Sequence, residues 1–158
     1  MPVVYLSLGS NLGDRHASLQ QAVDELKKLG SIEAMSDWYE TEPVGNTEQP
    51  WFINGVIKLV TGIEPDQLLT KIHEIEMRLG RVRDTPWGPR TIDIDLLLYD
   101  NLVLNTDILT LPHPRLHERR FVLIPLTEIA PNLIHPVLRK SIRELLATTT
   151  DTSNVLKI

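Results

Sequence analysis

The chain has 158 residues, enough for one domain with a hydrophobic core but too few for two. Its formal charge of −5 argues against a nucleic-acid groove that relies on bulk positive charge, and the absence of cysteine excludes disulfides and thiolate metal sites. Because the sequence has neither a run of eighteen apolar residues nor a signal-peptide pattern, we expect no membrane span. We expect a single domain over 1–158 from its length, a cytoplasmic protein from its lack of cysteine, and a monomer from its small size and polar composition.

The first half of the chain alternates between strand and helix patterns. A strand is expected over 3–8, and apolar residues at helical spacing predict a helix over 15–29. A second strand is expected over 32–41, followed by a loop that contains two prolines. The segment 51–60 alternates as a strand does, and a helix that begins with a proline is expected over 65–79.

The second half is less regular. The segment GPRTIDIDLLLYD (88–100) contains an apolar strand, and 102–105 is expected to return as a short hairpin strand. The segment 113–131 predicts broken short helices. Ser141 is a suitable cap for a last helix, and the final ten residues are expected to form a tail.

The order of these elements is β-α-β-β-α-β, with additions at the C-terminal end. A helix after the first strand and another after the third suggest two helices packed on a largely antiparallel sheet. The sequence therefore predicts an α+β protein with a ferredoxin-like core.

The strand within 88–100 carries two carboxylates among apolar residues. One face is expected to be formed by Ile92, Ile94, Leu96 and Leu98. Asp93 and Asp95 project from the other face, about 7 Å apart, and two ionised carboxylates this close need a positive partner. Arg90 could neutralise them in a purely structural ion pair, whereas Mg²⁺ prefers carboxylate oxygens supplemented by water and phosphate. We favour the metal site.

Arginine dominates the basic residues of the middle of the chain. Residues 72–139 contain eight arginines and no lysine. The planar guanidinium matches two phosphate oxygens at once, although each arginine could also pair with a nearby surface acid. Beside the paired aspartates, this arginine-rich segment favours phosphate binding.

Other candidate residues admit two readings. His113, between two prolines, makes either a local contact or a phosphate contact, and Trp87 is either a loop anchor or part of a lid. Phe52 is explained by core packing, but Asn54 on the same face of its strand needs a hydrogen-bond partner.

Four segments carry a more specific pattern: SLGSNLGDR, YETEPVGNTEQPWFIN, GRVRDTPWGPRTIDIDLLLYD and LPHPRLHERRFVLIPL. In this order and spacing they resemble the 6-hydroxymethyl-7,8-dihydropterin pyrophosphokinases of folate biosynthesis. The resemblance implies transfer of pyrophosphate from ATP to the hydroxymethyl group of a reduced pterin, with release of AMP. ATP, the pterin and two Mg²⁺ ions are the only ligands that it implies; no nucleic-acid or membrane partner is expected.

The resemblance also implies roles for individual residues. Asp93 and Asp95 would bind both Mg²⁺ ions and lie beside the pterin, while Arg81 and Arg90 would be catalytic and contact the phosphates. The ATP site would comprise Glu76, Arg81, Arg83, Trp87, Arg90 and His113. The pterin site would comprise Thr41, Glu42, Val44, Phe52, Asn54, Trp87, Arg119 and Phe121.

The chain departs from the family pattern at two positions. Pro114 follows the histidine where some members carry an aromatic residue, and Ile108 stands where a basic residue is sometimes found. Two other classes of protein would also use parts of this sequence. A nucleotidyltransferase or glycosyltransferase could use the two aspartates on a nucleotide, and a ferredoxin-like regulatory domain would bind a small ligand without needing them.

Overall fold

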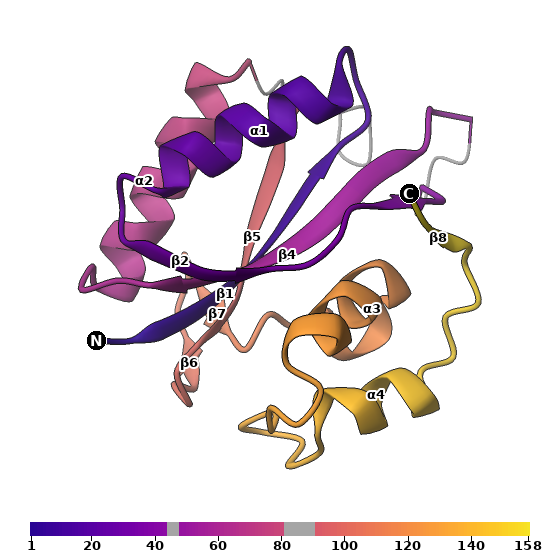
Figure 1. The fold of residues 1–158 in the computed structure, drawn as a ribbon. Coiled ribbons are helices and arrows are strands. Elements are labelled where there is room, and N and C mark those ends of the chain that lie inside the picture. Colours follow the sequence, from indigo (N-terminus) through magenta and orange to yellow (C-terminus); the bar gives the residue numbers. More distant parts are fainter. Residues whose placement is uncertain (44–47, 81–90) are drawn as a thin grey trace.

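The computed structural model describes residues 1–43, 48–80 and 91–158 (Figure 1). The first elements are β1 Val3–Ser10, α1 Arg15–Leu26, β2 Ser31–Met35, β3 Tyr39–Thr41, β4 Phe52–Val60, α2 Pro65–Arg78 and β5 Asp93–Tyr99. They are followed by β6 Leu104–Asn105, β7 Thr110–Leu111, the short 3₁₀ helix η1 Leu116–Glu118, α3 Arg120–Ile129, α4 Ile142–Thr148 and β8 Val155–Lys157. No described helix is long and apolar enough to cross a membrane.

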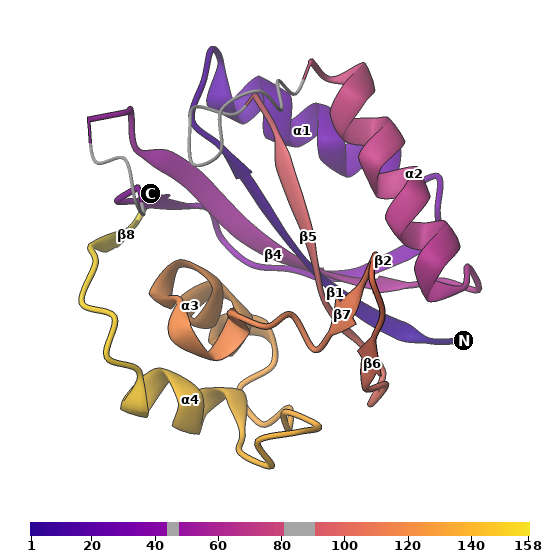
Figure 2. The same cartoon turned by 180° about the vertical axis from the view of Figure 1, so that it is seen from behind.

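The main sheet has the strand order β5-β1-β4-β3-β8, with β2 also paired to β4. Every pairing is antiparallel. Helices α1 and α2 cover one face of the sheet, α3 lies against the other face, and α4 packs on the outer side of α3 (Figures 1 and 2). This arrangement confirms the predicted α+β, ferredoxin-like fold.

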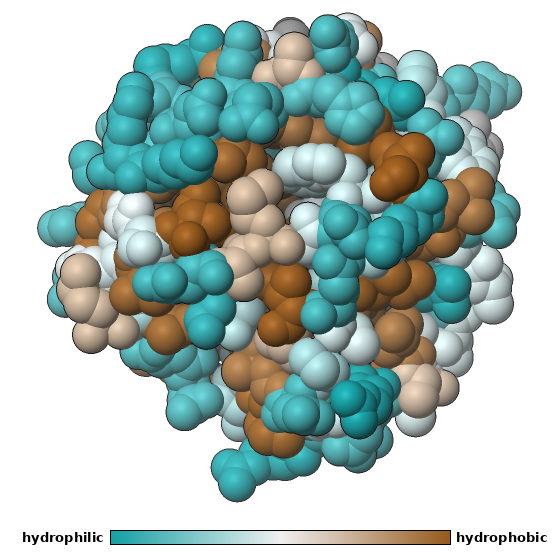
Figure 3. Space-filling view, in the orientation of Figure 1, coloured by the Kyte–Doolittle hydropathy of each residue, from teal (hydrophilic) through white to brown (hydrophobic). Residues whose placement is uncertain are grey.

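Each face of the sheet has its own hydrophobic core. Leu6 and Leu8 of β1 pack with residues of α1 and α2, whereas Tyr5 of the same strand packs on the other side with α3 and α4. Hydrophilic side chains cover the outer side of α1 (Figure 3). Because both faces of the central strands are covered, polar side chains on them need a specific explanation.

Local signals set the helix ends. The Asp14 carboxylate accepts a hydrogen bond from the Ala17 amide at the start of α1. At α4, Ser141 and Glu144 form a reciprocal capping box, as the predicted cap requires. Helix α1 is shorter than the predicted 15–29, because the chain tightens after Leu26 into turns with i to i−3 hydrogen bonds.

The prediction of one continuous strand over 32–41 is wrong, because this segment forms two strands, β2 and β3, which both lie along the same side of β4. Between them Ser36 uses its hydroxyl to accept a hydrogen bond from the Val56 amide at 2.9 Å. The Trp38 ring fills the space beside Gly55, where an added Cβ would lie 2.6 Å from the ring. The side chains of this segment thus interrupt the strand.

The alternation predicted that Leu98 shares a face with Ile92, Ile94 and Leu96. This prediction is wrong, because Leu98 packs in the other core. The register between β1 and β5 shifts after the Leu6–Leu96 pair, so that Leu97 and Leu98 both pack on the α3 side. A β-bulge inserts one residue and reverses the alternation beyond it.

The final ten residues do not form a free tail. Residues 155–157 form β8, which pairs with β3 through Tyr39–Lys157, Glu40–Leu156 and Thr41–Val155. The short helices expected within 113–131 are present as η1 and α3, which contains Pro125. The strand expected within 102–105 is present as β6, but in the described part of the chain it forms its hairpin with β7, in a separate two-stranded sheet, and not with the preceding strand β5. The pairing of β8 is between segments far apart in sequence, which a local pattern does not reveal.

Candidate active site

Asp93 and Asp95 lie at the beginning of β5, an edge strand of the described sheet. Both carboxylates are half-buried, whereas Ile92 and Ile94 between and before them are buried in the core beneath α1 and α2. The two carboxylates therefore project toward the α3 side of the sheet. In the register, Asp93 is opposite Gly9 of the neighbouring strand β1.

Gly9 also lies opposite Asn54 on its other side, in β4, so the three residues form a row across the sheet. A Cβ added at Gly9 would lie 2.2 Å from Asn54 Oδ1, which places the Asn54 amide over Gly9. The Asn54 Nδ2 donates to the Thr41 hydroxyl, and both residues are buried. The row thus consists of the Asp93 carboxylate, Gly9, which has no side chain, and the oriented Asn54 amide.

Arg119 and Phe121 come from the beginning of α3. The Arg119 Cζ lies 5.5 Å from the centroid of the Phe121 ring, within the range of a cation–π contact. Burial lowers the pKa of Arg119, whereas Asp95 and Asp93 act in the opposite direction, because their charges lie close to the guanidinium. The start of α3 therefore brings a cation to the two carboxylates.

His113 lies beside the same charges. Its backbone amide donates to Leu97 O at 2.9 Å, and its Nδ1 accepts from the Arg115 amide at 3.1 Å. Burial, with a smaller contribution from the Arg119 charge, lowers the pKa of His113 to about 4, although Asp93 opposes the shift. The imidazole is therefore neutral near pH 7, and its proton lies on Nε2 because Nδ1 is the acceptor.

We expect the His113 imidazole to titrate with a pKa about 4 in the protein without metal or nucleotide. An unfolded chain takes up this proton near pH 6.5, so stability is complete above pH 6.5 and falls as the pH decreases toward 4. NMR titration of the ring protons measures the pKa directly, with His16 as an exposed reference. A midpoint near 6.5 for His113 would contradict the burial described here.

A cavity of about 270 Å³ opens at the free edge of β5. Asp95 and His113 are among the residues that line it. Its walls come from α2, β5 and the β6–β7 hairpin, with Leu69, His73, Ile94, Leu96, Thr106, Asp107, Ile108, Leu109, Thr110 and Pro114. The hairpin residues were not among the predicted site residues, because only the fold carries them to this edge.

Glu76 of α2 is buried, and its Oε2 accepts a hydrogen bond from the Ile94 amide at 2.9 Å. This bond joins α2 to the strand between the two aspartates. A carboxylate that accepts a backbone amide holds the strand in place. The position of Glu76 thus supports the geometry of β5, whatever its contact with ATP.

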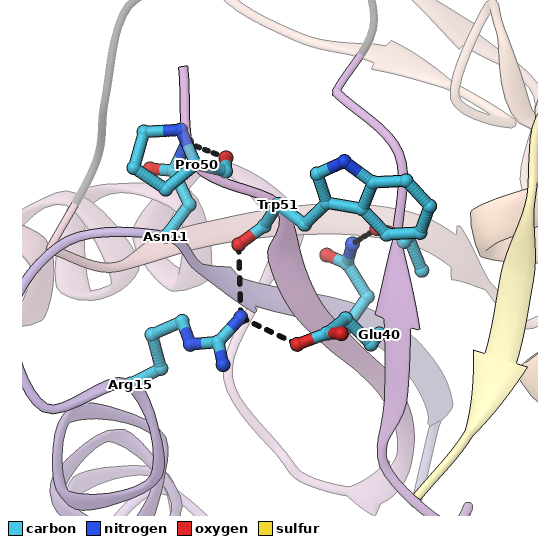
Figure 4. Close-up of polar contacts among 7 residues, drawn as sticks. Asn11, Arg15, Glu40, Pro50 and Trp51 are labelled. Atoms are coloured by element: carbon cyan, nitrogen blue, oxygen red, sulfur yellow. Dashed lines mark hydrogen bonds and ion pairs between the residues drawn. The ribbon is translucent and has the colours of Figure 1, made fainter.

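The turn after β1 is connected to the segment before β4 (Figure 4). Asn11 donates from Nδ2 to the Gln49 side chain at 2.9 Å and to Pro50 O at 3.0 Å. Arg15 donates to Glu40 Oε2 at 2.9 Å and to Trp51 O at 3.0 Å. The GSNLGDR segment therefore orients the chain that enters β4 at Phe52.

The remaining predicted site residues divide into two groups. Thr41 ends β3 opposite Phe52, and Glu42 follows it, with both its amide and its carboxylate bonded to Asn154. Residues outside the described ranges are Val44, Arg81, Arg83, Trp87 and Arg90. The structure thus brings together one side of the predicted site, formed by residues of β3, β4, β5 and α3.

Comparison with known proteins gives a consistent family. Residues 5–131 match the 7,8-dihydro-6-hydroxymethylpterin-pyrophosphokinase (HPPK) family. A 2-amino-4-hydroxy-6-hydroxymethyldihydropteridine pyrophosphokinase from Aquifex aeolicus is 45% identical over 144 residues, which cover 91% of this chain and 90% of the relative. The folic acid synthesis protein fol1 of Schizosaccharomyces pombe is 42% identical across 91% of this chain, which spans only 20% of that longer protein.

A solved structure shows the same fold. The Plasmodium falciparum HPPK-DHPS structure with pteroate superimposes with a TM-score of 0.73 at 18% identity, covering 92% of this chain and 42% of that one. At this identity the likeness concerns the fold, whereas the sequence matches above concern the family. The chain belongs to the 7,8-dihydro-6-hydroxymethylpterin-pyrophosphokinase family, and its reaction is pyrophosphate transfer in folate biosynthesis.

Proposed function

We propose that this chain transfers pyrophosphate from ATP to the hydroxymethyl group of 6-hydroxymethyl-7,8-dihydropterin on the sheet face shared by Asp93, Asp95 and Asn54. The observation that carries this proposal is the row Asp93, Gly9 and Asn54, which sets an oriented amide near a carboxylate. The amide suits the donor–acceptor edge of a pterin, and the carboxylates suit cations that accompany phosphates.

The two carboxylates fit Mg²⁺. Both are half-exposed oxygen donors on one face of one strand. Within the described ranges, no group of three or more His, Cys, Asp or Glu side chains is arranged to hold a metal ion by itself. Mg²⁺ usually takes one or two protein carboxylates and completes its shell with water and substrate phosphates. Two ions bound to Asp93 and Asp95 would neutralise phosphate charge and favour ionisation of the attacking hydroxyl.

The pterin site would lie between Phe52 and Phe121. Asn54 is held by Thr41, so its amide has a fixed direction in which to meet the ligand. The backbone around Glu42 would bind the rest of the pterin edge. Arg119, beside Phe121, would balance the charge of the carboxylates as the phosphates arrive.

ATP would occupy the cavity at the edge of β5, whose lining includes Asp95 and His113. A neutral His113 would donate from Nε2 to a phosphate oxygen. Arg81 and Arg90 would contact the phosphates and stabilise their charge during transfer, with Arg83 and Trp87 closing the site. These four roles rest on the sequence resemblance.

The test is incubation with Mg²⁺, ATP and 6-hydroxymethyl-7,8-dihydropterin, followed by chromatography of the nucleotides. AMP that forms only in the presence of the pterin is the expected result. ADP would indicate an ordinary kinase, and release of pyrophosphate a nucleotidyltransferase. No turnover by a folded protein would favour a binding module.

Omission of Mg²⁺ from the assay tests the metal requirement. Light scattering during gel filtration tests the proposed monomer. The cytoplasmic location stays a prediction.

A further inference from the structure

The C-terminal segment, residues 149–157, contacts both sides of the proposed pterin site. We call this segment the C-terminal strap. It follows α4 and passes the beginning of α3 before it joins the sheet as β8 (Figures 1 and 2). The family match ends at residue 131, so the strap lies outside it.

The first contact of the strap is with the start of α3. The Arg120 amide donates to Asp151 Oδ2 at 2.8 Å. The side chain at the N-cap position, Arg119, makes no capping hydrogen bond, and the first turn of α3 contains no acidic residue. Asp151 therefore supplies, from outside the helix, the carboxylate that a helix N-terminus favours.

The Asp151 carboxylate is itself held in orientation. Its Oδ1 accepts from the Ser153 amide at 2.9 Å and from the Ser153 hydroxyl, while Arg120 Nε donates to Ser153 O at 3.1 Å. Burial acts to raise the pKa of Asp151, but the hydrogen bonds from Ser153 and Arg120 outweigh it and lower this pKa. The carboxylate is thus a fixed, ionised acceptor.

The second contact is with the end of β3. The Glu42 amide donates to Asn154 O at 3.1 Å, and the Asn154 amide donates to Glu42 Oε1 at 2.8 Å. Next to this pair, Thr41 is opposite Val155 in the β3–β8 register. Thr41 is also the residue whose hydroxyl accepts from Asn54. The strap therefore reaches the residues that orient the amide.

We propose that the C-terminal strap is a positioning element for the pterin site, in which Asp151 fixes the start of α3 and Asn154 fixes the end of β3. This inference rests on the proposed function, because it takes Phe121 and Glu42 as parts of the pterin site. Asp151 touches no substrate in this scheme. It acts through the Arg120 amide, which lies between Arg119 and Phe121 in the chain.

Selectivity between the two substrates distinguishes positioning from general stabilisation. The strap contacts elements on the pterin side, whereas the cavity proposed for ATP is lined by α2, β5 and the β6–β7 hairpin. A loosened α3 start should therefore weaken pterin binding selectively. A merely structural defect would affect both substrates.

The experiment measures the KM for each substrate, with AMP formation as the readout, for Asp151→Ala and Asp151→Asn. Loss of the helix cap in Asp151→Ala is expected to raise the pterin KM roughly 5- to 30-fold, with the ATP KM and kcat within about twofold of wild type. Asp151→Asn keeps an acceptor oxygen and should recover most of the affinity. Lys157→Ala is the matched control, because it removes the strap's ion pair with Asp37 at 2.8 Å, away from Glu42 and Arg120.

Wild-type protein is assayed first. If the proposed function is wrong, the wild type forms no AMP. If only the positioning role of the strap is wrong, the wild type is active and the variants have the same kinetic constants. A folded Asp151→Ala with an unchanged pterin KM, or with equal increases for both substrates that Lys157→Ala reproduces, would overturn the proposal. If Asp151→Ala does not fold, Ser153→Ala carries the test: it removes one hydrogen bond to Asp151 and should raise the pterin KM about threefold. An unchanged value would overturn the proposal equally.

Discussion

Replacing Asp95 with alanine is expected to reduce kcat roughly 10²- to 10³-fold, the loss typical of removing one electrostatic contact to the reacting centre. Asp95 projects away from the core formed beneath α1 and α2, and it is only half-buried. Its removal therefore opens no hole in that core. It does leave Asp93 as the single carboxylate on this face of β5, so the two Mg²⁺ ions proposed for this site would lose one of the two carboxylates that would hold them.

Calorimetric titration with MgATP and thermal unfolding, each with wild type and variant, check this expectation. The affinity for MgATP should fall with kcat, while the unfolding free energy without ligand should change by about 1 kcal/mol or less. Asp24→Ala is the control, since Asp24 is an exposed carboxylate on α1 whose lysine partner lies 3.9 Å away. An Asp95→Ala protein that bound MgATP normally would leave the metal hypothesis without support.

The elements that the sequence predicted well are those whose ends depend on close neighbours. The capping box of Ser141 and Glu144 lies within one helical turn, and Gly80 after α2 has the positive φ of 85° that ends a helix without strain. The predictions that were wrong concern elements whose partners are far away in the sequence. The bulge that turns Leu98 depends on β1, and β8 exists only because β3 is available beside it.

The candidate site divides in the same way. Alternation along one strand was sufficient to predict that Asp93 and Asp95 share a face, and the spacing of Phe52 and Asn54 gave a second polar face. No local pattern could show that these faces meet across β1, because that depends on register. The same holds for Asn11 and Arg15, whose acceptors include backbone carbonyls 39 and 36 residues away.

Gly9→Ala is expected to raise the pterin KM roughly 10- to 100-fold with little change in the ATP KM. The added Cβ would lie 2.2 Å from Asn54 Oδ1, so the amide must move and its hydrogen bond to Thr41 is lost. A buried amide without its partner costs free energy, and its displaced atoms no longer meet the pterin edge. Steady-state kinetics with each substrate varied in turn measures both constants.

Two other glycines separate this effect from backbone damage. Gly55→Ala places a Cβ 2.6 Å from the Trp38 ring, so it should lower the unfolding free energy without a selective effect on pterin. Gly62→Ala meets only the flexible end of Met1, at 3.2 Å, and should be nearly neutral. If Gly9→Ala behaved like Gly55→Ala, losing stability but not pterin affinity, Asn54 would be a structural amide and not a ligand contact. A selective loss of pterin affinity would instead mean that position 9 must lack a side chain, so that the Asn54 amide stays in place between Thr41 and the aspartates of β5.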